Sequence, residues 1–317
     1  MLSRVADNLY WMRRYIERGD QIARVVGVNL DLAFDRAPAD VARLWGRLLS
    51  AVWSAPPWAQ LDRADGEAMM DLTSIDAVAS CFAAARENAR QVRQHISGDM
   101  WEQVNRVHLA LNDPSRRAAW AARPHGYFQT VREGAALFDA AVHSGLTREE
   151  GWQFLQLGLF LERAAGTARL LACQTRESRP AVRPFHALDE QLEWIVLLRT
   201  CDALELYQRR CGTELRPERI VHFLIADSLS PRSIRYALDQ IARALAGLAA
   251  AVPGAPAVAQ TSDLIAAVES DSPDPLSVIS RIETECDRVH DAVYATYIHH
   301  LRPIAPVASR VAPWTTP

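Results

Sequence analysis

The chain has 317 residues, of which 49% are hydrophobic and 23% are charged, so it can bury a large core and is not a disordered polymer. The formal net charge of −3 gives no basic excess for binding nucleic acid or an anionic membrane, so neither is an expected partner. All 35 basic side chains are arginine, which excludes phosphate-loop lysines, Schiff-base lysines and lysine general bases.

The cysteines and the apolar segments predict a cytoplasmic chain. Five cysteines, at positions 81, 173, 201, 211 and 286, form no CxxC pair and no regular disulfide framework, which indicates a reducing compartment. The N-terminal residues lack the pattern of a secretion signal. The longest apolar stretch, LAGLAAAVPGAPAVA, is too short and too interrupted to span a bilayer.

Hydrophobic residues recur every three or four positions, without sustained alternation, so we predict an all-α fold. The first helix carries one apolar stripe, made of Val5, Leu9, Met12, Ile16, Ala23, Val26 and Leu30. Helices are expected at about residues 2–35, 39–54, 74–97, 99–112, 125–145, 147–177, 187–212, 217–227, 231–251 and 274–301.

Helix signals and breaks define the expected organisation. Ser74 or Asp76 is a candidate cap for the third helix, and Thr147 with Glu150 matches a capping box. Proline, glycine and asparagine mark breaks at 56–57, 112–114, 144–145, 179–184, 230–231 and 253–256, none long enough for an interdomain linker. We therefore expect a single multi-helix bundle over 1–304, with approximate halves 1–145 and 146–304, and a proline-rich tail at 305–317.

One motif occurs twice in the chain. YIERGDQIAR at 15–24 returns as FLERAAGTAR at 160–169, which places Glu17 and Glu162 145 positions apart. Adjacent helical residues point about 100° apart, so the Glu and Arg of one copy cannot satisfy each other. The second copy lies in an otherwise apolar helix, and a buried charge without a partner costs several kcal/mol.

We predict that the two motif helices pack about a pseudo-twofold axis, with Glu17 reaching Arg163 and Glu162 reaching Arg18. Gly158 and other small residues near Glu162 indicate that a backbone or a ligand approaches closely there. Two interpretations stay open: the crossed pairs fix helix register, or some of these groups face a pocket and bind a polar ligand.

A third charged cluster lies in ARENARQVRQHIS, where Arg86, Glu87, Arg90 and Arg93 occupy one helix. A solvated charged surface is the simple interpretation. The alternative is a site for a carboxylate or a phosphate, because arginine forks match these groups bidentately.

These segments resemble the bacterial alpha-E domain family, an all-helical domain with a Glu-Arg motif. The matching blocks run from Met1 to about Leu301: MLSRVADNLYWMRRYIER, ARENARQVRQHISGDMWEQVN, WQFLQLGLFLERAAGTARLL, WIVLLRTCDALELYQRR and FLIADSLSPRSIRYAL. The chain departs from the family's usual pattern at two places. Gly19-Asp20 stands where the family often has Ala-Glu, so the acidic side chain is shorter, and Leu159 stands where a longer or charged residue is usual.

The resemblance implies a partnership with circularly permuted ATP-grasp ligases, sometimes by fusion, in peptide or amide-bond synthesis or modification. We therefore expect a non-catalytic helical partner that binds the ligase, its substrate or both, with no cofactor of its own. The alternative is an enzyme in which Glu17 or Glu162 acts as acid or base on a peptide or carboxylate ligand. The candidate ligand-binding residues are Arg14, Arg18, Arg86, Glu87, Arg90 and Arg163.

Other catalytic patterns are missing from the sequence. No Glu-x-x-His or HExxH motif occurs, so we expect no metal site. Cys286 and His290 share a helical face at i, i+4, as an activated thiolate requires, but no third group orients them and packing is the expected role.

Overall fold

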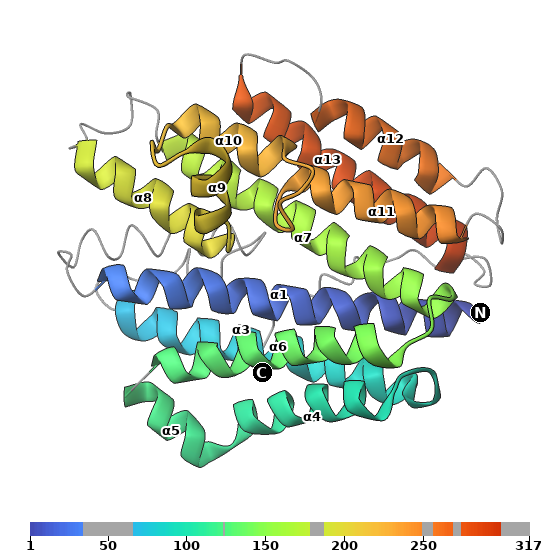
Figure 1. The fold of residues 1–317 in the computed structure, drawn as a ribbon. Coiled ribbons are helices and arrows are strands. Elements are labelled where there is room, and N and C mark those ends of the chain that lie inside the picture. The colour runs from blue at the N-terminus through green and yellow to red at the C-terminus, as the bar shows by residue number, and fades with distance from the viewer. Residues whose placement is uncertain (34–65, 123, 178–186, 249–255, 269–273, 299–317) are drawn as a thin grey trace.

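The structure is a computed structural model that describes residues 1–33, 66–122, 124–177, 187–248, 256–268 and 274–298. These residues form helices without any strand, so the predicted all-α fold is confirmed (Figure 1). The helices are α1 (Ser3–Ala33), α3 (Gly66–Gln91), α4 (Gly98–Asn112), α5 (Pro114–Ala122), α6 (Pro124–Gly145), α7 (Glu150–Glu177), α8 (Ala187–Thr200), α9 (Leu204–Cys211), α10 (Pro217–Ala226), α11 (Ile234–Leu248), α12 (Pro256–Val268) and α13 (Pro275–Val293). A 3₁₀ turn (Arg93–His95) follows α3, and a π-helical turn (Tyr294–Ile298) follows α13.

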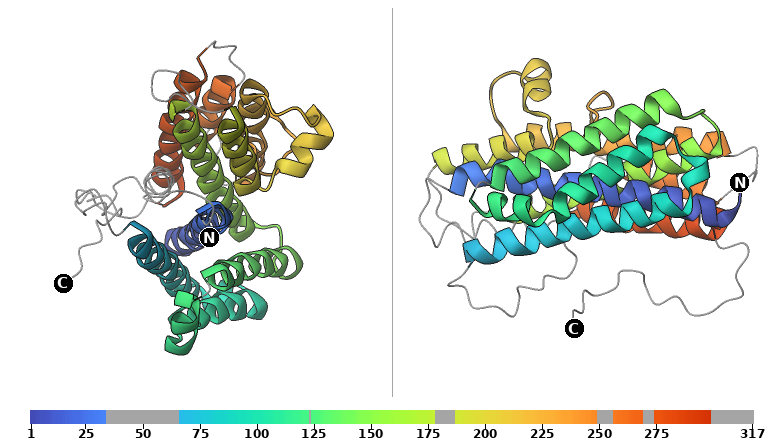
Figure 2. Two further views of the ribbon diagram at one scale, coloured as in Figure 1. Left: turned by 90° about the vertical axis from the view of Figure 1, so that its left-hand side faces the viewer. Right: turned by 90° about the horizontal axis from the view of Figure 1, so that it is seen from below.

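The longer helices pack as two rings that meet along α1 and α7. In the first ring, α1 contacts α3 and α6, and α4 lies between those two helices. In the second ring, α7 contacts α11 and α13, and α12 lies between them. The left panel of Figure 2 looks along the helices and shows the first ring below the second, with α1 and α7 at the centre. The two groups of helices therefore meet at the contact between α1 and α7, which we call the α1–α7 seam.

Apolar burial accounts for the central position of α1. All seven residues of its predicted stripe are buried, and Leu9, Met12 and Ile16 have no exposed surface. A fully buried side chain of this size contributes about 1.5–3 kcal/mol through removal of apolar surface from water. The predicted stripe therefore identifies the face with which α1 enters the core.

Two of the predicted helix starts are wrong. α3 begins at Gly66, so neither Ser74 nor Asp76 caps it, and the Asp76 carboxylate instead accepts from Arg117. α7 begins at Glu150, so Thr147 is not its N-cap and the predicted capping box does not form. An acidic residue in the first turn of α7 complements the helix dipole without such a cap.

The helix expected at 187–212 is also wrong, because it divides into α8 and α9. Asp202 lies between them with φ of 52°, in the left-handed region that interrupts a helix. The sequence pattern predicts breaks at Pro114 and Pro256 and no helix directly after them, whereas α5 and α12 begin at these two prolines. A proline is tolerated in the first turn of a helix, where its missing N–H has no partner to lose.

The expected helix at 39–54 and the expected tail at 305–317 lie outside the described residues. Within them, no helix combines the length and the apolar character needed to cross a membrane.

Candidate functional site

Glu17 of α1 and Arg163 of α7 form a bidentate ion pair across the seam. Arg163 Nε donates to Glu17 Oε1 at 2.8 Å, and Arg163 Nη2 donates to Glu17 Oε2 at 3.0 Å. Both side chains are buried, and Glu17 is only 2% exposed. One half of the predicted crossed pairing is therefore confirmed.

Glu162 of α7 forms the reciprocal pair. Arg18 Nε donates to Glu162 Oε1 at 2.6 Å, and Arg18 Nη2 donates to Oε2 at 3.1 Å. Arg14 Nε also donates to Glu162 Oε2, at 2.8 Å. The crossed pairing is thus confirmed in both directions, and Arg14 joins it.

Two glycines let α7 approach α1 closely enough for these pairs. A Cβ at Gly158 would collide with the backbone carbonyl oxygen of Tyr10, and a Cβ at Gly166 would collide with the Gln21 side chain. The close approach predicted at Gly158 therefore comes from the backbone of α1. Gln21 and Gly166 are 145 positions apart, like the two motif glutamates, so corresponding positions of the two copies meet. A pseudo-twofold relation requires such contacts, and the relation itself stays a prediction.

Around Glu17 the ion pairs continue into the segment before α11. Arg232 donates through Nη1 to Glu17 Oε1 at 2.8 Å and through Nη2 to Asp20 Oδ2 at 3.0 Å. Asp20 also accepts from Arg24 Nε at 2.8 Å, and Arg24 Nη1 lies 3.0 Å from Asp202 Oδ2. Cations and anions alternate through this network, so each buried charge is compensated.

Arg13 connects the same network to α6. Its guanidinium is buried, pairs with the Asp139 carboxylate and lies 4.0 Å from Glu17 Oε2. The guanidinium carbon also lies 5.7 Å from the centre of the Phe138 ring, within the range of a cation–π contact. The Glu17 side therefore joins α1, α6, α7 and the segment before α11.

Around Glu162 the network ends in an aromatic cluster. Arg14 Nη1 donates to the Tyr10 hydroxyl at 3.2 Å and lies 3.1 Å from His290 Nδ1. The Tyr10 hydroxyl lies 2.8 Å from the same nitrogen, and the two rings are stacked. Because Arg14 can only donate, Nδ1 acts as the acceptor and His290 is the neutral imidazole.

The pKa values of both motif glutamates argue against proton transfer. Burial acts to raise the pKa of Glu17, but Arg163 and Arg232 outweigh it and hold this pKa well below its usual range. Burial likewise acts on Glu162, where Arg18 and Arg14 outweigh it and keep the pKa low. A general acid or base needs a pKa near the working pH, so these fully ionised, fully paired carboxylates suit a structural role better.

Cys286 and His290 do not form an activated pair. Burial raises the pKa of the Cys286 thiol to about 12, and burial together with Arg14 lowers the pKa of His290 to about 4. A neutral thiol beside a neutral imidazole is a poor nucleophile. The packing role expected for these two residues fits this geometry.

The arginine cluster of α3 lies apart from the motif. Arg86 Nε donates to Asn105 of α4 at 2.7 Å, and its guanidinium lies over the Trp101 ring. Arg90 pairs with Glu87 on the exposed face of α3, with Nη2 at 2.6 Å from Oε1. Arg90 is therefore paired on the surface of α3, and the contacts of Arg86 lead to α4 rather than to the seam.

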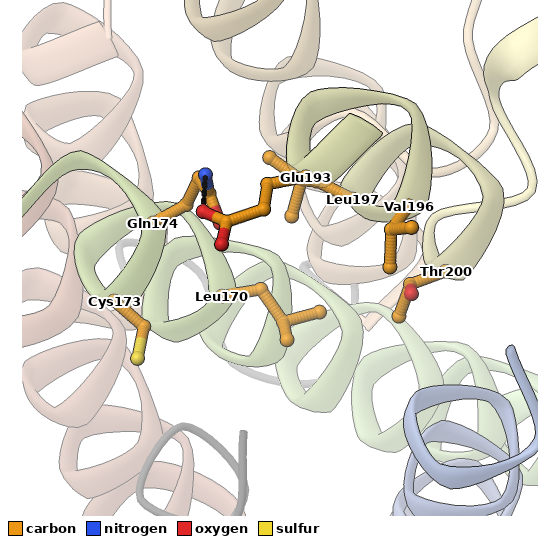
Figure 3. Close-up of a pocket in the computed structure, with 7 residues that line it drawn as sticks. All are labelled: Leu170, Cys173, Gln174, Glu193, Val196, Leu197 and Thr200. Atoms are coloured by element: carbon orange, nitrogen blue, oxygen red, sulfur yellow. Dashed lines mark hydrogen bonds between the residues drawn. The ribbon is translucent and has the colours of Figure 1, made fainter. Parts of the chain in front are cut away.

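A small cavity lies between α7 and α8, with Gln174, Glu193 and Thr200 among its lining residues (Figure 3). Gln174 Nε2 donates to Glu193 Oε2 across it at 3.4 Å. Its volume of about 20 Å³ leaves room for about one water molecule. This cavity is too small for a substrate.

A larger groove, of about 470 Å³, follows α7 between α6 and α11. Arg163 lines it, as does Leu159, which lies one turn before Arg163 on α7. Among the predicted ligand-binding residues, Arg163 thus combines a motif pair with access to a groove.

Sequence reasoning missed Arg232 and the contact between Tyr10 and His290. Arg232 lies in the block FLIADSLSPRSIRYAL, which carried part of the family resemblance but supplied no paired acid nearby in sequence. Two acids of α1, Glu17 and Asp20, are its partners. The separation of more than 200 positions explains why no local pattern could reveal it.

These observations define a class: an all-helical protein whose two rings are joined by reciprocal, buried Glu-Arg pairs. The chain belongs to the Alpha-E family, described as a predicted alpha-helical domain with a conserved ER motif, whose family model matches residues 1–298. This match confirms the resemblance drawn from the five sequence blocks. Within the described residues, no group of three or more His, Cys, Asp or Glu side chains gathers as a metal site would need.

The chain is also similar to uncharacterized mycobacterial proteins. One protein of Mycobacterium bovis and one of Mycobacterium tuberculosis are each 23% identical over 262 residues. This alignment covers 75% of the chain but only 29% of each relative, so most of their length lies outside the match. No solved structure matches the chain.

Proposed function

We propose that this chain is a non-catalytic helical partner of an ATP-grasp-type ligase, acting in peptide or amide-bond synthesis or modification. It binds the ligase, its substrate or both. The family resemblance supplies the kind of partner. The longer mycobacterial relatives have room outside the match for further domains, as a fused ligase would need.

The pairing of the motif carries the proposal. Glu17 and Glu162 each accept from two arginines inside the α1–α7 seam, and both pKa values lie far below neutrality. Removing one member of such a pair typically costs about 3–5 kcal/mol, which is reason enough to retain the motif without catalysis. The alternative is an enzyme that uses Glu17 or Glu162 as acid or base. This geometry does not favour it, because a general acid or base needs a pKa near the working pH.

Co-purification with the ATP-grasp ligase of the same genome tests the proposal. We expect the two chains to co-elute in size-exclusion chromatography, and ATP turnover by the ligase to change when this chain is added. Separate elution together with unchanged turnover would contradict the partnership.

A paired substitution separates the partner from the enzyme. Glu17→Gln with Arg163→Met removes both members of one pair, while Arg232 keeps Asp20 as its partner. If the folded double variant still changes ligase turnover, the motif is structural. If it stays folded, associated and able to bind the substrate but turnover no longer changes, the acid-base alternative replaces the proposal.

A further inference from the structure

The groove beside α7 carries an excess of positive charge. Arg148, Arg163 and Arg243 line it, together with His143. Its single acidic lining residue among the described residues, Asp139, already pairs with Arg13. An anionic ligand would therefore meet more cations than anions along the groove.

Several polar side chains in the groove make no hydrogen bond to the part of the chain that the structure describes. Gln156 is 9% exposed, yet its amide makes no hydrogen bond to any residue that the structure describes. Gln240 and the guanidinium of Arg243 likewise contact no described polar group. Their polar atoms are open to the groove, so a ligand that offers donors and acceptors can pair with them in place of water.

Arg163 keeps one donor for such a ligand. Its Nε and Nη2 bind Glu17, while Nη1 makes only a 3.4 Å contact with the carbonyl oxygen of Pro231. That contact exceeds the usual range for an N–H···O hydrogen bond, so a carboxylate in the groove can replace the carbonyl as the acceptor from Nη1 while Nε and Nη2 stay on Glu17.

The shape of the groove fits an extended chain. Lining residues follow α7 from Trp152 to Arg163, which at 1.5 Å per residue spans about 17 Å, the length of about five extended residues. Cations stand at both ends of this span, and Gln156 lies between them on α7. Side-chain amides donate and accept, as pairing with a peptide backbone requires.

We propose that this groove binds an extended peptide segment that carries carboxylate side chains. The amides of Gln156 and Gln240 pair with its backbone, the arginines pair with its carboxylates, and the ring of Tyr236 covers its apolar atoms. The cations are spread along the groove rather than gathered at one point, which favours a peptide over a single phosphate group. That this peptide is the ligase's substrate rests on the proposed function, whereas the binding rests on the groove alone.

Fluorescence anisotropy of a labelled Ala-Glu-Ala-Glu-Ala-Glu peptide, titrated with the full chain, tests the proposal. We expect this peptide to bind at least tenfold more tightly than the same peptide with glutamine in place of glutamate. No binding, or equal binding of both peptides, would overturn the proposal. Equal displacement of the labelled peptide by inorganic pyrophosphate and by unlabelled peptide would assign the groove to small anions and overturn it as well.

Matched variants locate the binding. Arg243→Ala is expected to weaken the acidic peptide about tenfold, which corresponds to about 1.4 kcal/mol, one charge-assisted contact. Gln156→Met, of similar volume, is expected to weaken the acidic and the glutamine peptides by similar factors, since it removes a backbone contact. Circular dichroism checks that each variant is folded.

Arg106→Ala is the control. Arg106 is exposed on α4, makes no contact with a described polar group and removes the same charge. Equal weakening by Arg106→Ala and Arg243→Ala would show attraction to overall charge and overturn the assignment. Peptide binding that persists while the ligase neither co-elutes nor responds would refute the proposed function alone.

Discussion

Glu17 and Glu162 occupy corresponding positions of the two motif copies, yet their arginines come from different parts of the chain. Glu162 is held by Arg14 and Arg18, both from α1. Glu17 is held by one arginine of α7, Arg163, and by Arg232 from the segment before α11. Each glutamate is therefore neutralised by two arginines, but these arginines do not all occupy corresponding positions of the two motif copies.

Leu159 gives the reason for this difference. It stands 145 positions after Arg14, where the repeat would place a second cation for Glu17. Leu159 is buried and lines the groove instead. Arg232 supplies the second cation to Glu17 and also binds Asp20.

Removal of either motif carboxylate is expected to cause the largest loss of stability. Glu17→Gln leaves Arg163 and Arg232 without their shared anion, which is expected to lower the free energy of unfolding by about 3–5 kcal/mol. Glu162→Gln is expected to cost less, about 2–3 kcal/mol, because the Arg18 side chain is 32% exposed and can turn toward water. Urea unfolding measures both, and a larger loss for Glu162→Gln would contradict the ranking.

A double-mutant cycle tests whether Glu17 pairs with Arg163 by measuring the coupling energy between them. Glu17→Gln combined with Arg163→Met is expected to show a coupling energy of about 1–3 kcal/mol, since the two residues contact each other. Glu162→Gln combined with Arg163→Met removes members of two different pairs and should couple more weakly. Stronger coupling in the second cycle would refute the crossed pairing.

Moving the second cation from position 232 to position 159 tests whether an arginine at position 159 could pair with Glu17. Arg232→Met is expected to lower the free energy of unfolding by about 1–3 kcal/mol, because Glu17 and Asp20 each lose one charged hydrogen bond. Adding Leu159→Arg to this variant places a guanidinium at the position equivalent to Arg14 and should restore part of the loss in urea unfolding. A further loss would show that position 159 cannot serve Glu17.

Among the described residues, a histidine joins the ion-pair network on the Glu162 side alone, so acid should affect the two sides differently. The pKa of His290 falls from 6.5 to about 4, so between these pH values the unfolded chain binds a proton that the folded chain does not. Stability therefore falls as the pH is lowered through this window. In urea unfolding from pH 7 to pH 4, His290→Gln should flatten this fall, whereas the exposed His95→Gln should leave the slope unchanged.

The smallest effect is expected outside the seam. Arg90 and Glu87 pair on the exposed face of α3, where water screens their charges. Arg90→Ala should leave the urea midpoint within measuring error. A clear loss of stability would mean that the α3 cluster contributes to the fold in a way that its described contacts do not explain.

The sequence by itself determined the all-α class, most of the helices and the crossed pairs. Periodicity fixed the buried face of α1, since burial depends on residues three and four apart. The pairs followed because adjacent Glu and Arg residues cannot meet on one helix and a buried charge must find a partner. The left-handed turn at Asp202 and the starts of α5 and α12 could not be predicted from the sequence. A change in one backbone angle, or a proline in the first turn of a helix, leaves the pattern of apolar residues unchanged.

Only the tertiary structure decided which distant groups complete the site. Arg232 reaches Glu17 and His290 reaches Tyr10 because the rings bring α11 and α13 beside the central helices, and no local pattern couples residues so far apart in sequence. The groove exists for the same reason, since its walls come from α6, α7 and α11. Helical periodicity says which face of each helix is buried, whereas the packing of the helices sets which polar groups meet.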